Sequence, residues 1–369
     1  MRLRRDTTRR PRAGQYPEDV ERPLLVAEDL VTTFSTPRGE LTAVDGVSLR
    51  LERGRTLGVV GESGSGKTVL TRSIMGLLPR RGVRTSGTVW FNGRQISGLS
   101  PSQRRAIWGV EMAVVFQDPM TSLNPTMKIG RQITESLRYH LSMTSAEADA
   151  QAVELLGQVG ISTPERRLHE YPHQLSGGLR QRVTIAIALA CGPRLLFADE
   201  PTTALDVTVQ AQILDLLADL QRERAMAMIL VSHDLGVVAG RTDEIAVMYG
   251  GQVVEVGPTR ALFSDVKMPY TEALLRSSPR ADRPSHTPLE VIPGRPPDLV
   301  DPPPGCRFAP RCSYARVRCA LEAPPLVEAA TPGHRYACWY PVGTPVAPSV
   351  ASANGRPPVP ERVVGEVAP

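Results

Sequence analysis

The feature that most constrains this chain is a glycine-rich loop, Gly61-Glu-Ser-Gly-Ser-Gly-Lys-Thr68. The apolar run Leu57–Val60 before it predicts a short buried strand, and Val69–Leu78 after it predicts a helix. In that context the pattern G-x-x-x-x-G-K-[ST] forms a loop whose backbone N–H groups surround phosphate oxygens at a helix N-terminus. The chain has only three lysines, and Lys67 stands where such a loop requires one. We therefore predict a nucleotide site.

Different residues of the loop are expected to make different contacts with the nucleotide. Lys67 is expected to reach the β- and γ-phosphates, and the Thr68 hydroxyl is expected to bind Mg²⁺. The predicted nucleotide contacts in the loop are Gly61, Glu62, Ser63, Gly64, Ser65, Gly66, Lys67 and Thr68.

A second part of a phosphoryl-transfer site follows the apolar strand Leu195–Ala198. Asp199 is placed to hold the Mg²⁺ shell, and Glu200 to polarise an attacking water. Two acids at a strand end are often ordinary surface residues, but the loop at 61–68 favours the catalytic interpretation. Two other strand ends carry polar residues: Gln117 follows Ala113–Phe116, and His233 follows Met228–Ser232, where its ring could reach a γ-phosphate.

A further anion site is predicted at Ser176-Gly-Gly178, which opens a predicted helix over 179–191. Short apolar runs alternate with helical patterns, which predicts an α/β fold. Leu24–Phe34 and Leu41–Leu51 predict antiparallel strands, and 245–255 predicts a hairpin turning on Gly250-Gly251. Residues 101–160 are predicted to be mostly helical, with a capping box at Thr144–Glu147.

The order of these motifs resembles the ATP-binding cassette (ABC) ATPases over about residues 24–265. The resemblance implies a P-loop ATPase core with an antiparallel β subdomain and an inserted helical subdomain. It also implies that two cassettes pair head to tail, so that Ser176, Gly177 and Gly178 contact nucleotide held by the partner cassette. Asp206 would lie in the dimer-contacting loop that begins at Ala204. The predicted catalytic residues are Glu200, His233 and Gln117, and the predicted Mg²⁺ ligands are Thr68, Gln117 and Asp199.

Phe34 lies 27 residues before Gly61, where the family places an aromatic ring that stacks on adenine. An ordinary strand aromatic is the alternative interpretation of this residue.

Proline divides the chain, because 20 of the 34 prolines follow residue 276. We predict a disordered basic arm over 1–21, an ABC ATPase domain over 22–276 and a C-terminal extension over 277–340. The helical subdomain is expected at about 101–190, and a disordered tail over 341–369.

Four cysteines lie in the predicted extension: Cys306, Cys312, Cys319 and Cys338. Their chemistry allows an iron–sulfur cluster, zinc or neither, whereas Cys191 is expected to be a small buried hydrophobe. Pro269–Leu275, Ile292–Pro297 and Gly305–Cys312 resemble the C-terminal extension of bacterial dipeptide/oligopeptide importer ATPases, which nickel importers share in related form. Some members carry a [4Fe–4S] cluster there, so the resemblance favours a cluster, with zinc as the alternative. Because these cysteines are distant in sequence from the phosphate motifs, we expect the cluster to be structural.

Charge argues against nucleic acid as a partner. Residues 1–12 carry six arginines and one aspartate, and the remaining charges cancel at 37 basic and 37 acidic side chains. No apolar run approaches the length of a membrane span. Together with these exclusions, the resemblance implies an ATP-hydrolysing subunit at the cytoplasmic face of the inner membrane, coupled to import of di- or oligopeptides. Its expected partners are a second ATPase subunit, two permease subunits and an extracytoplasmic substrate-binding protein.

Three other classes of cassette protein share parts of this pattern. A nickel or other small-solute importer would use the same chemistry. A cassette ATPase of DNA maintenance would need a long coiled-coil arm, but only 58 residues separate Gln117 from Ser176. Ribosome-associated cassette proteins usually have two cassettes in one chain, and here there is one.

Overall fold

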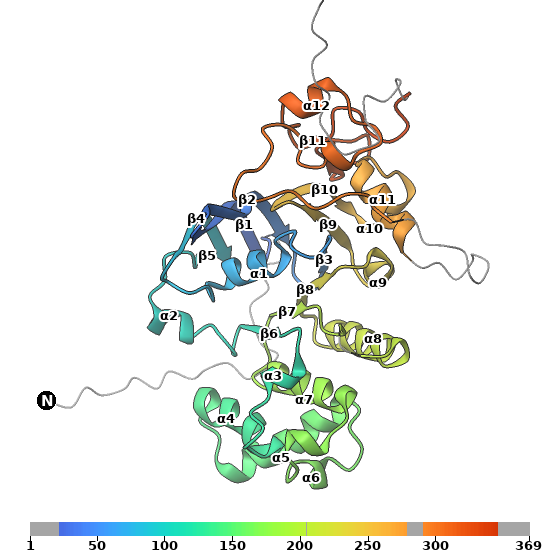
Figure 1. Ribbon diagram of the computed structural model, residues 1–369. Coiled ribbons are helices and arrows are strands. Elements are labelled where there is room, and N and C mark those ends of the chain that lie inside the picture. Colours follow the sequence, from blue (N-terminus) through green and yellow to red (C-terminus); the bar gives the residue numbers. More distant parts are fainter. Residues whose placement is uncertain (1–21, 204, 279–290, 346–369) are drawn as a thin grey trace, which may run out of the picture.

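The computed structural model describes residues 22–203, 205–278 and 291–345. The predicted basic arm, Ala204 and the predicted tail beyond residue 345 lie outside this part of the chain. Within it, two sheets stack in the middle of the molecule, with a helical group on one side and the C-terminal region on the other (Figure 1).

The larger sheet contains the strands that the apolar runs predict. Five strands lie side by side in the order β9-β3-β8-β7-β6 and run parallel. Because helices and the second sheet cover its faces, these strands are almost continuously apolar. Their carboxyl ends therefore meet at one edge of the sheet. The strands are β3 (Thr56–Val60), β6 (Met112–Val115), β7 (Leu195–Asp199), β8 (Ala227–Ser232) and β9 (Glu244–Tyr249).

The smaller sheet is antiparallel and has the order β2-β1-β4-β5. Helix α1 (Lys67–Met75) packs between the sheets, where Leu70 and Ile74 join one apolar core with residues of both. The helix begins directly at the glycine-rich loop, so this core fixes the loop against both sheets. The strands are β1 (Leu25–Thr36), β2 (Gly39–Leu51), β4 (Val83–Phe91) and β5 (Arg94–Gln95).

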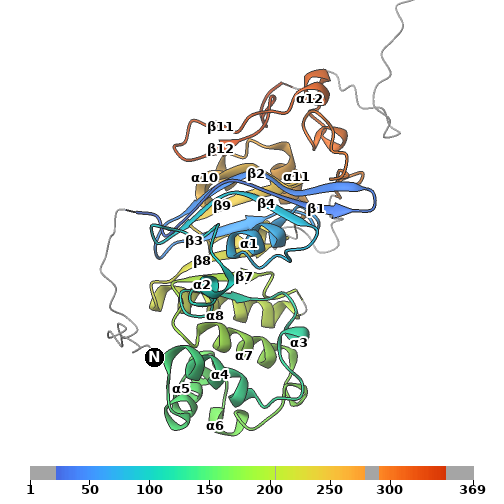
Figure 2. The same cartoon turned by 90° about the vertical axis from the view of Figure 1, so that its left-hand side faces the viewer.

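The helical group lies beyond the β6 edge of the large sheet (Figures 1 and 2). Helices α4 (Ile129–Leu141), α5 (Ser145–Gln158) and α7 (Gly177–Leu189) pack against one another. The predicted capping box of α5 is confirmed, because Thr144 and Glu147 each accept a hydrogen bond from the other's backbone N–H. Helices α3 (Pro119–Ser122), α6 (Pro164–Arg167) and the 3-10 turn η1 (Pro172–Gln174) belong to the same region. Outside it lie α2 (Pro101–Arg105), α8 (Val207–Glu223) and α9 (Leu235–Val238).

The C-terminal region extends the larger sheet. The predicted hairpin on Gly250-Gly251 is confirmed: β10 (Gln252–Pro258) pairs antiparallel with β9, and both glycines have positive φ. The far edge of β10 pairs with β12 (Arg335–Tyr336), which pairs with β11 (Val327–Glu328). The remaining elements are α10 (Thr259–Ser264), α11 (Pro269–Ser277), η2 (Ala309–Arg311) and α12 (Val317–Leu321).

A buried pair of polar side chains secures this junction. Glu255 on β10 and His334 before β12 are both fully buried, with 2.9 Å between Oε1 and Nε2. The same carboxylate accepts hydrogen bonds from the backbone N–H groups of Lys267 and Met268.

None of the helices in the described ranges has the length and apolarity to span a membrane.

Candidate functional site

The glycine-rich loop lies between β3 and α1, as the motif predicts. Gly66 shows why glycine is needed, because its φ is 102° and a Cβ there would lie 2.3 Å from the Ala43 carbonyl oxygen. Ser65 is buried, and its hydroxyl has no hydrogen-bond partner in the described structure. An orphaned hydroxyl in a loop at a helix N-terminus fits a site built for an anion.

Lys67 is the buried cation of this loop, with 4% of its side chain exposed. Its Nζ donates to the backbone oxygens of Gly61 (2.8 Å) and Glu62 (3.0 Å) and lies 3.7 Å from Glu200 Oε1. Burial lowers the pKa of Lys67, and the neighbouring carboxylates of Glu200 and Asp199 oppose this shift. Its ammonium group is thus already partly desolvated and held beside the loop.

Thr68 and Asp199 meet although they are 131 residues apart. The Thr68 hydroxyl donates to Asp199 Oδ1 at 3.0 Å. Burial raises the pKa of Asp199, and the hydrogen bond from Thr68 counteracts the rise. A hydroxyl and a carboxylate are oxygen ligands of the kind Mg²⁺ prefers, and Mg²⁺ also keeps waters and substrate phosphates in its shell. These two residues therefore fit the predicted Mg²⁺ site.

Glu200 is where the predicted catalytic side chains converge. Gln117 Nε2 and the Thr203 hydroxyl each donate to Glu200 Oε2 at 2.9 Å. His233 Nδ1 lies 3.4 Å from the same oxygen. The backbone of Glu200 has φ 46°, which is unusual outside glycine and which we read as local strain that the surrounding contacts sustain.

The Glu200 carboxylate is strongly held in its ionised form. The hydrogen bond with His233 is the main cause that lowers the pKa of Glu200 to about 2, and Thr203 and Lys67 add to it. The same interaction raises the pKa of His233. A carboxylate of such low basicity is suited to orienting and polarising a water molecule, and less to removing its proton completely in the ground state.

The predicted second anion motif belongs to the helical group. Ser176 is the N-cap of α7 and accepts from Leu179 N–H, so the helix begins at Gly177 rather than at residue 179 as predicted. Gly178 packs against α8, because a Cβ there would lie 2.8 Å from Val209 Cγ1. Ser176 and Gly177 are exposed, and Figures 1 and 2 show α7 on the opposite side of β6 and β7 from α1.

Two other predicted contacts also lie apart from the Glu200 cluster. Asp206 is exposed and caps α8 through the Val209 N–H. Phe34 is half-buried on β1, paired in register with Leu41 and Val83. Within the loop, Ser63 and Gly64 are exposed to solvent.

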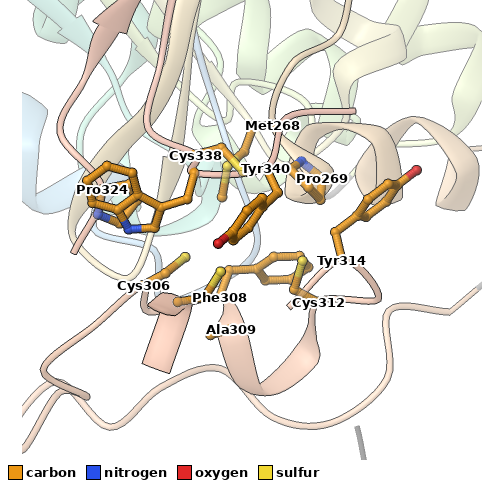
Figure 3. Close-up of a pocket in the computed structure, with 12 residues that line it drawn as sticks. Met268, Pro269, Cys306, Phe308, Ala309, Cys312, Tyr314, Pro324, Cys338 and Tyr340 are labelled. Carbon is orange, nitrogen blue, oxygen red and sulfur yellow. The ribbon is translucent and has the colours of Figure 1, made fainter. Parts of the chain in front are cut away.

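The four late cysteines line one pocket (Figure 3). Cys306, Cys312, Cys319 and Cys338 surround it together with Phe308 and Tyr340, and none is in a disulfide. Burial raises the pKa of Cys312 and Cys338 to about 12, so these thiols are protonated at neutral pH. Cys191 is buried apart from them, as predicted.

The pocket as it stands does not have the geometry of a metal centre. Its cavity volume is about 10 Å³, close to the minimum that holds one water molecule. Nowhere in the described ranges is a group of three or more histidine, cysteine or acidic side chains arranged to hold a metal ion. The predicted [4Fe–4S] cluster is therefore not supported, although the residues predicted to hold it do come together.

Sequence reasoning missed three side chains that contact the site. Thr203 bonds Glu200, and its place three residues after Glu200 is the only signal it offers. Arg311 pairs with Glu62 across a separation of 249 residues, and Tyr270 accepts a hydrogen bond from the Glu62 N–H. The extension is distant from the phosphate motifs in sequence, but its Arg311 contacts the glycine-rich loop directly.

Comparisons with known proteins agree with this geometry. Residues 44–203 match the family described as ABC transporter, and residues 254–319 match the oligopeptide/dipeptide transporter C-terminal region. The chain is 49% identical to the oligopeptide transport ATP-binding protein OppD of Bacillus subtilis, over 83% of this chain and 86% of that one. It is 46% identical to the dipeptide transport ATP-binding protein DppD of Escherichia coli, over 86% and 97%.

A solved structure shares the fold at lower identity. It is the dimeric structure of a post-hydrolysis state of an ATP-binding cassette bound to ADP and Pi, with a TM-score of 0.58 and 27% identity. The match covers 64% of this chain and 99% of that one. From the two family matches and the relatives at 46–49% identity, this chain belongs to the ABC transporter ATP-binding proteins and carries the C-terminal region of the oligopeptide/dipeptide transporters.

Proposed function

We propose that this chain is the ATP-binding and ATP-hydrolysing subunit of an importer that takes up di- or oligopeptides through separate permease subunits. The observation that carries the proposal is the convergence of Lys67 and Thr68, which follow β3, with Asp199 and Glu200 at the end of β7. These two parallel strands lie on either side of β8 in the sheet. The relatives at 46–49% identity are oligopeptide and dipeptide transport ATP-binding proteins, which favours peptides over nickel or another small solute.

Each side chain has a task in this proposal. The loop 61–68 binds the triphosphate of ATP, and Lys67 supplies a positive charge to its terminal phosphates. Thr68, Asp199 and Gln117 would hold Mg²⁺, which would offset the negative charge of the phosphates. Glu200 orients the attacking water, while His233 holds Glu200 in place and reaches toward the γ-phosphate. Phe34 stacks on adenine.

The proposed assembly contains two ATPase subunits, identical or different. Ser176, Gly177, Gly178 and Asp206 face the second subunit, and the exposure of Ser176, Gly177 and Asp206 supports this. Two permeases and an extracytoplasmic binding protein complete the importer, with this chain on the cytoplasmic face of the membrane. The domain division proposed is 22–276 for the ATPase and 277–340 for the extension, although the matched C-terminal region already begins at residue 254.

The test is substrate-stimulated hydrolysis in the assembled complex. The chain is purified with permease and binding-protein partners and reconstituted in liposomes. Phosphate release is then measured with peptide, with Ni²⁺ and without substrate. We expect peptide-loaded binding protein to increase hydrolysis, and Glu200→Gln to abolish the increase. Stimulation by Ni²⁺ alone would assign the nickel function instead, and a complex that hydrolyses no ATP would contradict the proposal.

The four cysteines are proposed as ligands of a metal centre, [4Fe–4S] or alternatively zinc. Their convergence from three separate segments and the absence of disulfides among them support the proposal. Binding would require the side chains to separate and the thiols to lose their protons. Anaerobically purified protein should contain about four irons per chain if the centre is [4Fe–4S]. Cys312→Ser should remove the metal and Cys191→Ser should not. A preparation with neither iron nor zinc would refute it.

A further inference from the structure

A buried ion pair joins the C-terminal extension to the glycine-rich loop. Arg311, the last residue of η2, donates from Nη1 to Glu62 Oε2 at 2.6 Å and from Nη2 to Glu62 Oε1 at 2.9 Å. The Arg311 side chain is only 4% exposed, and that of Glu62 is 26% exposed. Two parallel N–H···O bonds to one carboxylate are stronger and more directional than a single contact.

The remaining donors of Arg311 are also occupied, so the guanidinium has a fixed position. Its Nε donates to the Pro293 carbonyl oxygen at 2.8 Å, and Nη1 donates to the Tyr249 hydroxyl at 3.2 Å. The hydrogen bonds to Glu62 raise the pKa of Arg311, so it remains charged. A group held in this way determines where the Glu62 carboxylate lies.

The backbone of Glu62 is held from the same side. Its N–H donates to the Tyr270 hydroxyl at 2.8 Å. The Tyr270 ring is fully buried and packs against Tyr249 and Phe308, with ring centroids 4.5 and 5.2 Å away. Phe308 also lines the cysteine pocket (Figure 3). Both the main chain and the side chain of Glu62 are therefore positioned by residues outside the loop.

The charge of Glu62 matters because it lies in the phosphate-binding loop. Its backbone oxygen accepts from Lys67 Nζ at 3.0 Å, and its carboxylate is close enough to raise the pKa of Lys67. An uncompensated carboxylate in the phosphate-binding loop would repel the phosphates of a nucleotide, and a paired arginine cancels most of that field.

We propose that Arg311 is a positioning residue of the nucleotide site: by neutralising and fixing Glu62, it gives the loop its affinity for nucleoside triphosphate. The proposal rests on the proposed function, in which this loop binds ATP. It means that the extension contributes to the nucleotide site. It also places the cysteine pocket next to a contact with the loop, because Cys312, which lines the pocket, directly follows Arg311 in the chain.

The test measures the Kd of ATP by titration calorimetry on the full chain, with the KM and kcat of hydrolysis in the assembled complex. We expect Arg311→Gln to raise Kd and KM by about tenfold, a coupling of ordinary size between two sites, with kcat nearly unchanged because the Glu200 cluster is intact. Arg311→Lys keeps the charge but loses the planar pair of nitrogens that binds both carboxylate oxygens, so its loss of ATP affinity should be intermediate.

The control is Arg307→Gln, which breaks a different ion pair between the extension and the core. Arg307 binds Asp45 on β2 and the Gly250 carbonyl, and not the Glu62 carboxylate. Both variants should lower the melting temperature, but only Arg311→Gln should weaken ATP binding.

A rescue experiment separates charge compensation from a merely structural role. Adding Glu62→Gln to Arg311→Gln removes the unpaired carboxylate and should recover most of the lost ATP affinity. Three results would each overturn the proposal. One is a wild-type Kd of ATP in Arg311→Gln, and another is an equal loss of ATP affinity in Arg307→Gln. The third is an ATP affinity in the double variant that does not recover. Failure of the wild-type chain to bind ATP would instead refute the proposed function.

Discussion

Gln117 and Glu200 follow neighbouring parallel strands and are 83 residues apart, yet the Gln117 amide donates a 2.9 Å hydrogen bond to the Glu200 carboxylate. Gln117 is exposed and Glu200 is mostly buried. The contact therefore connects the surface near the helical group to the centre of the site.

Replacing Glu200 with glutamine should separate ATP binding from hydrolysis. The change keeps the shape of the side chain but removes the charge that polarises water. We expect kcat to fall by about 10²- to 10⁴-fold, while ATP still binds with near wild-type affinity. Phosphate release and calorimetric titration measure the two effects. Thr203→Ala, which removes one hydrogen bond to the same oxygen, should lower kcat much less. Wild-type turnover in Glu200→Gln would contradict the role proposed for Glu200.

Replacing Lys67 with alanine should weaken ATP binding itself. The ammonium is buried and already held at the loop, so its loss removes a charge-assisted contact with phosphate. We expect the Kd of ATP to rise by at least about tenfold, equivalent to about 1.4 kcal/mol. Lys128→Ala, at the exposed start of α4, is the control and should bind ATP like the wild type. Equal ATP affinities in the wild type, Lys67→Ala and Lys128→Ala would contradict the phosphate-binding role of Lys67.

The pKa of His233 should depend on Glu200. In the wild type the carboxylate raises the pKa of His233. Glu200→Gln removes that charge, so the pKa should fall, because partial burial of the ring and the Lys67 charge, which both lower it, are then less opposed. NMR titration of the His233 ring protons measures the shift. Thr203→Ala keeps the charge and should leave the pKa of His233 raised; an unchanged pKa in Glu200→Gln would show that the two residues are not coupled.

The raised pKa of His233 also determines how the stability of the fold depends on pH. Because the folded pKa of His233 lies above its unfolded value, the His233–Glu200 attraction stabilises the fold below the unfolded pKa. That contribution is lost as the pH rises through the folded pKa. Urea unfolding across this range should show the dependence in the wild type and lose it in Glu200→Gln.

Replacing Gly66 with alanine should destabilise the fold through its backbone. The new Cβ would lie 2.3 Å from the Ala43 carbonyl oxygen at a φ of 102°. We expect the free energy of unfolding to fall by about 2–3 kcal/mol. Gly93→Ala is the matched control, because its φ is 75° and nothing lies within 4 Å of the added Cβ. Equal losses in urea unfolding would show that the contact with Ala43 is not what requires glycine.

Sequence reasoning located the parallel strands because strands buried on both faces must be continuously apolar, as in Leu195–Ala198. It predicted Thr68, Asp199 and Glu200 for one site because the loop and the strand ends carry local patterns. It could not find the pairing of Arg311 with Glu62, because no periodic pattern in the sequence indicates which residue an arginine in a proline-rich segment contacts. It also could not foresee how closely the cysteine side chains pack, because packing depends on the chain around them.

The way the extension joins the large sheet has a consequence for any shortened form of this protein. Strand β10 pairs with β9 on one side and with β12 on the other. A chain ending before His334 would expose the N–H and C=O groups of one edge of β10, and it would leave the buried Glu255 carboxylate without its imidazole partner. Unprotected edge strands add further strands from other molecules. Such fragments should therefore self-associate and precipitate, even though every phosphate-binding motif would still be present in them.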